Sequence, residues 1–215
     1  MATKQKTKSR PAEILREYGP YPGMERVHGV TFDGKNIWFA RGESLVALDP
    51  ESGAVVRELP VAADAGTAFD GQYFWQLADS RIQKVDARSG EVVATLPAPS
   101  QASGLAWAEG TLWVGEYRAR KIHQLDAATG AVLRTIVSDR FVTGVSFVGG
   151  ELWHGTQEAE RSEIRHVDPR TGEVLERLEM PAGTIVSGLE SDGAGVFYCG
   201  GGMSGKVRAV RKPRP

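Results

Sequence analysis

The sequence predicts an all-β protein, a five-bladed β-propeller with four antiparallel strands in each blade. The main evidence is a unit that recurs five times and begins with a glycine. The leading glycines are spaced 37, 38, 40 and 44 residues apart: Gly29, Gly66, Gly104, Gly144 and Gly188. Each unit holds short apolar runs separated by turn residues. Such periods, with four strands in each repeat, are typical of propeller blades.

Two further patterns place strands within each unit. Nine positions after the leading glycine stands an aromatic residue, in the order Trp38, Trp75, Trp113, Trp153 and Phe197. The third run ends in an Asp-x-x-x-Gly turn in the first four units, as in Asp126 to Gly130. Aspartate can accept hydrogen bonds from turn amides, and glycine permits the positive φ that closes such a turn. We therefore expect the aromatic residues to pack in the core.

The fifth unit stops after its third run, and the missing strand is expected from the other end of the chain. Ile14 to Tyr18, ILREY, reads like the fourth run of the first unit, Val55 to Leu59, VVREL. We predict that residues 14–18 complete the last blade, which closes the ring and leaves no open gap between its ends. The predicted division is a disordered basic tail over 1–11, one propeller domain over 12–211 and a basic tail over 212–215.

Composition limits the classes of function. The chain has 26 basic and 27 acidic residues, but nine of the bases lie in residues 1–10 and 206–215, which hold no acid. The body is therefore acidic, which argues against a nucleic-acid groove on it. No apolar run is long enough to span a membrane, and the first residues lack the apolar segment of a secretory signal. With a single cysteine, Cys199, we expect a cytoplasmic protein without disulfides.

The propeller geometry predicts which rim holds a site. Loops from the second to the third strand, and loops between blades, share one rim, and ligand sites are common on loops that a rigid scaffold holds. The ligand-binding residues expected on this rim are Arg41, Tyr117, Arg118, Arg140 and Gln157.

The catalytic candidates are residues that differ from those at the same position of the other units, a set that we call a column. Glu190 stands where the other units have Thr or Ser or Ala, and His28 is the one histidine immediately before a leading glycine. A carboxylate near the axis needs a partner, and Arg26 or Arg140 would make it a structural ion pair instead. His154 also differs from its column, and an interior histidine is the alternative to a metal ligand for both histidines.

The sequence contains no motif for nucleophilic catalysis or metal binding. Neither a Ser-His-Asp order, a Cys-x-x-Cys pair nor a His-Glu-x-x-His run is present. The cofactor is therefore unknown, and a divalent metal would need ligands from several blades.

The units resemble those of two propeller families. The run GLAWAEGTLWVGEYRARKIHQLDAATGAV, from Gly104, resembles the repeats of bacterial virginiamycin B lyase-like propellers. Those lyases carry out a magnesium-assisted elimination, and Glu116 falls on the Glu position of their second strand. The five-unit count and the runs Phe32-Asp33-Gly34 and Phe69-Asp70-Gly71 resemble the five-bladed glutaminyl cyclotransferases. That resemblance implies a carboxylate near the axis that handles the proton of an amine.

Three functions follow as expectations. The first is a propeller that binds a small molecule or a partner on one rim. The second is a lyase or cyclotransferase-type enzyme, with Glu190 as acid or base and His28 or Glu116 assisting, which requires these three side chains to meet in one cavity. The third is a protein-interaction platform formed by Tyr117, Arg118, Arg120 and Phe141.

Overall fold

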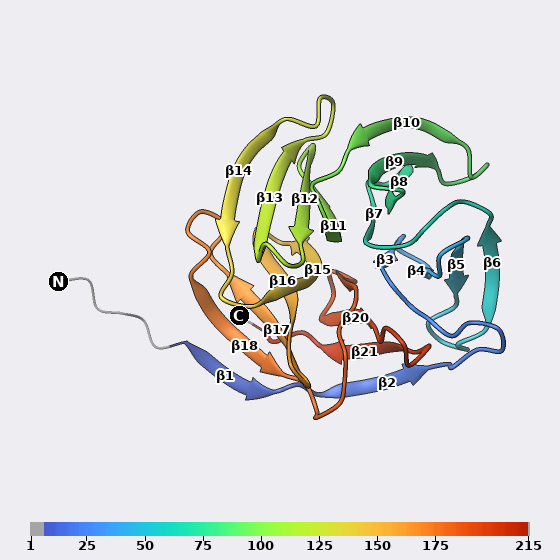
Figure 1. Cartoon of the computed structure of the whole chain (residues 1–215). Helices are drawn as coiled ribbons and strands as arrows, with labels where there is room; N and C mark the ends of the chain where they lie inside the picture. Colours follow the sequence, from blue (N-terminus) through green and yellow to red (C-terminus); the bar gives the residue numbers. More distant parts are fainter. Residues whose placement is uncertain (1–6, 215) are drawn as a thin grey trace.

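Five sheets arranged around one axis form the molecule (Figure 1). The computed structural model describes residues 7–214, which form strands and turns and no helix. Blade 1 contains β3 (Val30–Phe32), β4 (Ile37–Ala40), β5 (Leu45–Leu48) and β6 (Val55–Leu59). Blade 2 contains β7 (Thr67–Phe69), β8 (Tyr73–Ala78), β9 (Arg81–Asp86) and β10 (Val92–Pro97). Blade 3 contains β11 (Ala102–Ala108), β12 (Thr111–Glu116), β13 (Lys121–Asp126) and β14 (Val132–Val137).

The remaining strands form blades 4 and 5. Blade 4 contains β15 (Phe141–Val148), β16 (Glu151–Glu158), β17 (Arg161–Val167) and β18 (Val174–Glu179), and β1 (Lys8–Pro11) lies on its outer edge. Blade 5 contains β19 (Leu189–Ser191), β20 (Val196–Gly200), β21 (Val207–Arg211) and β2 (Ile14–Tyr18). The first strands of the five blades contact one another in turn, so they surround the axis. The predicted five-bladed β-propeller is confirmed.

The five leading glycines form a ring of backbone contacts between neighbouring blades. A Cβ added at any of them would lie 2.4–2.6 Å from a backbone atom of the following blade. The ring closes on itself, because a Cβ on Gly188 would lie 2.6 Å from the amide nitrogen of Val30. A methyl group would overlap these atoms, and backbone atoms cannot rotate away as a side chain would. Only glycine therefore lets the innermost strands pack this closely.

The hairpins between first and second strands explain the Phe-Asp-Gly runs. Oδ1 of Asp33 accepts hydrogen bonds from the amides of Lys35 and Asn36, at 2.8 and 2.6 Å. Its Oδ2 accepts one from Nε1 of Trp38, at 2.6 Å. Asp70 makes the same bond with Trp75. One carboxylate thus fixes the turn and satisfies the indole N–H of a buried ring.

The Asp-x-x-x-Gly turns form as predicted. In blade 3, Oδ1 of Asp126 accepts hydrogen bonds from the amides of Ala128 and Thr129, and Gly130 has φ +75°. Blades 1, 2 and 4 repeat the bonds. The Thr129 hydroxyl also donates to the Asp126 carboxylate at 2.8 Å, and that bond together with the amide bonds holds the pKa of Asp126 below its usual value.

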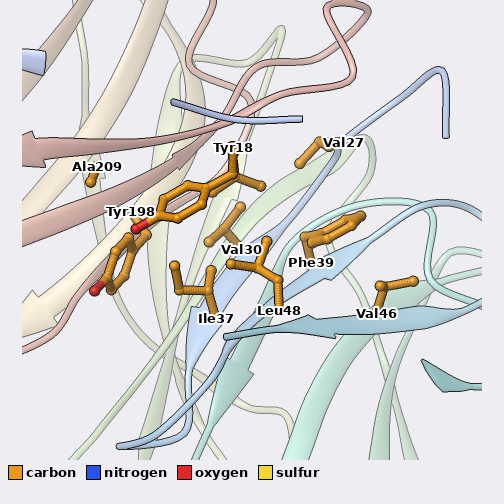
Figure 2. Packing of buried hydrophobic residues seen from close by; sticks show 10 residues of the cluster. Tyr18, Val27, Val30, Ile37, Phe39, Val46, Leu48, Tyr198 and Ala209 are labelled. Atoms are coloured by element: carbon orange, nitrogen blue, oxygen red, sulfur yellow. The ribbon is translucent and has the colours of Figure 1, made fainter. Parts of the chain in front are cut away.

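The N-terminal strand closes the ring. β2 pairs antiparallel with β21, with Ile14 opposite Val210 and Tyr18 opposite Val207, which confirms the predicted closure. Tyr18 is buried in the cluster between blades 5 and 1, next to Tyr198 (Figure 2). Its hydroxyl donates a hydrogen bond to the carbonyl of Pro50 in blade 1, at 3.0 Å. The first residues of the propeller therefore join its last blade to its first.

The expected N-terminal tail differs from the structure over its second half. Lys8–Pro11 forms β1, which pairs parallel with β18, so the prediction of a disordered tail is wrong for these residues. Arg10 pairs with Glu176 at 2.5 Å, and Ser9 donates a hydrogen bond to Glu179 at 2.6 Å. The acidic face of β18 thus attracts the basic segment. Residues 1–6 of the expected tail lie outside the described residues.

The fifth blade has a one-residue shift in register. Its first hairpin is one residue longer than that of blade 1, because Ser191 pairs with Phe197 whereas Phe32 pairs with Ile37. Glu190 therefore faces Tyr198. By its strand pairing, Tyr198 and not Phe197 occupies the position of the tryptophans in the other blades. By the same pairing, Cys199 occupies the position that His154 has in blade 4.

Substitution of one ring glycine tests the close approach. We expect Gly104→Ala to lower the free energy of unfolding by at least about 2–3 kcal/mol, because its Cβ would overlap backbone atoms of blade 4. Urea denaturation measures this. Gly149→Ala is the control, since Gly149 has open space around it and costs only its φ of +59°, about 1 kcal/mol. Equal losses in the two variants would contradict the ring.

Candidate functional site

A cavity of about 350 Å³ lies at the mouth of the axis. Loops on the predicted rim line it. All five residues that immediately precede the leading glycines take part: His28, Ala65, Ser103, Thr143 and Ser187. The wall is completed by Asp64, Gln101, Ala102, Tyr117, Gln157, Ile185 and Val186. The cavity thus sits where all five blades meet.

Two hydroxyls of this column bind the blades together. Ser103 donates to the carbonyl of Val142 at 2.8 Å, and Ser187 donates to the carbonyl of Val27 at 2.6 Å. Thr143 is buried, yet its hydroxyl has no hydrogen-bond partner among residues 7–214. The oxygen lies against Gly155, where a Cβ added to that glycine would be 2.5 Å from it.

Aromatic rings support one side of the mouth. Tyr117 stacks on Phe141 with ring centroids 4.9 Å apart, and the guanidinium of Arg120 lies over Phe141 at 4.6 Å. Gln157 is paired with Phe141 across β15 and β16. Tyr117 and Gln157 therefore come from neighbouring blades, and the Tyr117 ring is held by its stack on Phe141.

The mouth carries little charge. Desolvation, followed by the nearby charge of Arg26, lowers the pKa of His28 below its usual value, so this imidazole is neutral at pH 7. Among the described residues that line the cavity, Asp64 is the one acidic residue, and none is a lysine or an arginine. An anion would therefore be disfavoured here.

Glu190 lies deeper along the axis than this cavity. It stands two residues beyond its ring glycine, whereas His28 stands one residue before its own. Ser146 donates to its carboxylate at 2.7 Å, and the amide of Ser191 at 2.8 Å. The expected arginine partner is absent: Arg140 pairs with Glu163 at 2.9 Å. Desolvation, opposed by these hydrogen bonds, raises the pKa of Glu190 to about 7.

The other predicted residues lie apart from the mouth. Glu116 accepts a bond from His123 at 3.1 Å, if the ring nitrogen carries its proton, and Arg41 pairs with Glu58 at 2.6 Å. Arg118 is exposed on its hairpin. No cavity described for residues 7–214 is lined by two of the three catalytic candidates. The structure thus gathers His28, Tyr117 and Gln157, and it separates His28 from Glu190 and Glu116.

Sequence reasoning missed most of the cavity wall. Asp64, Gln101 and Ile185 fall in the predicted loops, but nothing in the units distinguishes them. The residues immediately before the five leading glycines were the sequence feature that could have identified the cavity, because all five line it. The one histidine among them stood out, and the serines and threonine did not.

No group of three or more His, Cys, Asp or Glu side chains able to hold a metal ion occurs in the described part of the chain. Over the same residues, no helix has the length and apolar character to cross a membrane.

The fold and the axial cavity define a five-bladed β-propeller, and comparisons with known proteins agree. Residues 78–212 match the PQQ_2 family model, described as outer membrane protein assembly factor BamB. The chain belongs to this family of propeller-repeat proteins. No curated protein matches its sequence.

Solved structures show the same architecture. Glutaminyl cyclase of Myxococcus xanthus matches with a TM-score of 0.78 and 17% identity, over 96% of this chain and 98% of that one. Hydrazine synthase of Kuenenia stuttgartiensis matches with a TM-score of 0.53 and 16% identity, over 82% of this chain and 56% of that one. At these identities the likeness shows the fold alone.

The pH dependence of stability tests the environment of Glu190. The folded protein keeps the Glu190 proton up to about pH 7, whereas the unfolded chain loses it above pH 4.5. The contribution of Glu190 to the free energy of unfolding is therefore fully present below pH 4.5 and is lost as the pH rises through 7. Glu190→Gln removes this titration. Between pH 5 and pH 8 we expect wild type to lose up to about 3 kcal/mol relative to the variant.

Urea denaturation of both proteins at the two pH values gives the difference, in which the other titrating groups cancel. Parallel pH profiles would show that Glu190 titrates normally.

Proposed function

We propose that the protein is a binding module, which takes a small uncharged molecule in the cavity at the mouth of the axis. The observation that supports this most is the convergence of five loops on a cavity of about 350 Å³, a size in the range of small-molecule sites. The neutral imidazole of His28 supplies hydrogen bonds. Tyr117 and Ile185 supply apolar contact.

The sign of the charge supports an uncharged ligand. Asp64 disfavours an anion, and no lysine or arginine lines the cavity within residues 7–214. Catalysis is the weaker proposal, because His28 lines this cavity and Glu190 does not. A cyclase reaction like that named for the Myxococcus xanthus protein would need a proton-transfer group at the mouth, and Glu190 lies beyond the glycine ring.

A cytoplasmic location belongs to the same proposal. Its support is one buried free thiol, Cys199, whose pKa burial raises to about 12 and which is therefore unreactive. Fractionation of cells that make the protein tests this, and recovery outside the cytoplasm would contradict it.

A fragment screen by ligand-observed NMR tests the binding site. Equal sets of neutral, acidic and basic fragments are offered to the wild type, and we expect the hits to come mainly from the neutral set. Gln157→Trp should fill the mouth and weaken these hits at least about tenfold. The matched control is Gln72→Trp, which places the same ring on the exposed turn between β7 and β8, at the opposite rim.

Two results would count against the proposal. If Gln157→Trp weakened none of the neutral hits, the ligands would bind elsewhere on the protein. A majority of acidic hits would show that the charge argument is wrong.

A further inference from the structure

A second cavity, of about 170 Å³, lies between blades 3 and 4, away from the mouth of the axis. Its apolar walls include Ile122 and Ile136 of blade 3, and Val167 and Val174 of blade 4. It opens to solvent beside Val137 and Asp139, which are both exposed. His154, which differed from its column in the sequence, lines this cavity rather than the axial one.

The His154 ring is held in one neutral form. The side chain is 1% exposed, and Nδ1 lies 3.2 Å from the carbonyl oxygen of Gly155. A carbonyl only accepts hydrogen bonds, so Nδ1 carries the proton and Nε2 has a free lone pair. Burial lowers the pKa of His154 to about 4, which keeps the ring neutral. No hydrogen bond reaches Nε2 in the part of the chain that the structure describes.

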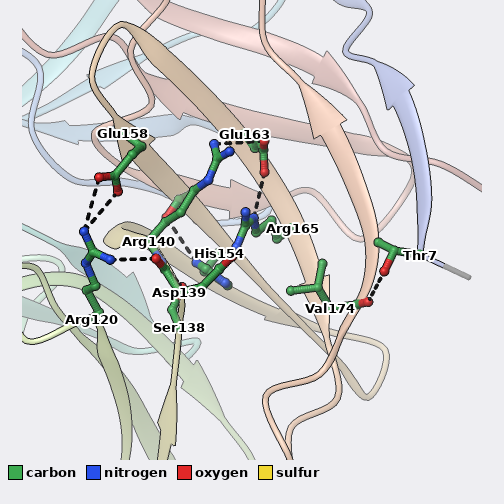
Figure 3. Close-up of polar contacts among 11 residues, drawn as sticks. Thr7, Arg120, Ser138, Asp139, Arg140, His154, Glu158, Glu163, Arg165 and Val174 are labelled. Carbon is green, nitrogen blue, oxygen red and sulfur yellow. Dashed lines mark hydrogen bonds and ion pairs between the residues drawn. The ribbon is translucent and has the colours of Figure 1, made fainter. Parts of the chain in front are cut away.

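The charged groups beside the cavity are held in ion pairs. Arg165 is 1% exposed and lies opposite His154 on the neighbouring strand. It pairs with Glu163 at 2.7 Å and with the carboxylate of Asp139 (Figure 3). Asp139 therefore already has a cation as its partner. A charged ligand would lose its water here, and Asp139 is not free to act as its counter-ion.

The volume sets the size of an occupant. An engineered apolar cavity of about 150 Å³ stays dry and binds benzene. The cavity between blades 3 and 4 is slightly larger and adds one acceptor. We propose that it is a second binding site, which takes one small neutral molecule with an apolar ring and a single hydrogen-bond donor, of the phenol class, held by Nε2 of His154.

The direct test is the ¹⁵N chemical shift of His154 Nε2 in the full-length protein. Phenol should move this resonance in a saturable manner, because its hydroxyl donates to the lone pair. Anisole has the same ring and no donor, and we expect it to bind at least about fivefold more weakly. Gln157→Trp should leave the phenol titration unchanged, since its site is the axial mouth.

Two variants replace His154 with the residues that other blades have at the same position, and they make the test more specific. Blade 2 has Gln76 and blade 3 has Val114 at the position of His154. His154→Val removes the acceptor, so phenol should fall to the affinity of anisole. His154→Gln keeps an acceptor and should retain part of the preference. Val174→Phe should fill the cavity and abolish binding of both probes.

The proposal is overturned if phenol leaves the His154 resonance unmoved at millimolar concentration. It is also overturned if anisole binds wild type as tightly as phenol, or if Val174→Phe binds phenol unchanged. The first two measurements use the wild-type protein, so they decide the matter even if a variant fails to fold.

Discussion

The contact of five glycine backbones around the axis is the constraint on which the rest of the structure depends. Each innermost strand approaches the next so closely that a methyl group at the contact would overlap backbone atoms. This contact sets the distance between blades, and from it follow the aromatic packing between sheets and the convergence of five loops at the mouth. The ring of glycines also divides the residues near the axis into two groups with different surroundings. His28 lies before the ring, in a cavity open to a ligand, whereas Glu190 lies beyond it, among hydroxyls of neighbouring blades.

Closure of the ring uses both packing and charge. Tyr18 fills the core between the last and first blades, and β1 extends the same segment onto the outer edge of blade 4. On β18, β1 covers an edge whose acidic residues match its bases. The equivalent edges of blades 1 to 3 carry exposed valines and leucines, such as Val132 and Leu133 in β14. One N-terminal segment therefore pairs with the outer strands of two neighbouring blades, β21 and β18.

Much of the fold could be predicted because propeller blades repeat local chemistry. A leading glycine, an indole and an Asp-x-x-x-Gly turn each form within a few residues of sequence, so they can be read without the tertiary structure. The one-residue shift at Tyr198 was missed because a longer turn is invisible to fixed spacing. The strand at Lys8–Pro11 was missed because its partner, β18, is far away in sequence. For the site, the rim was predictable from topology. The partners of Glu190 and Arg140 were not, since they depend on which side chains of neighbouring blades meet.

The central claim is that the five blades form one closed ring and unfold together. Native-state hydrogen exchange tests it most directly. We predict that the amides of the five innermost strands, and those of β2 paired with β21, exchange with the same free energy, equal to that of global unfolding measured with urea. Exchange of β2, or of any single blade, at a clearly lower free energy would show that the ring opens in parts and would contradict this account.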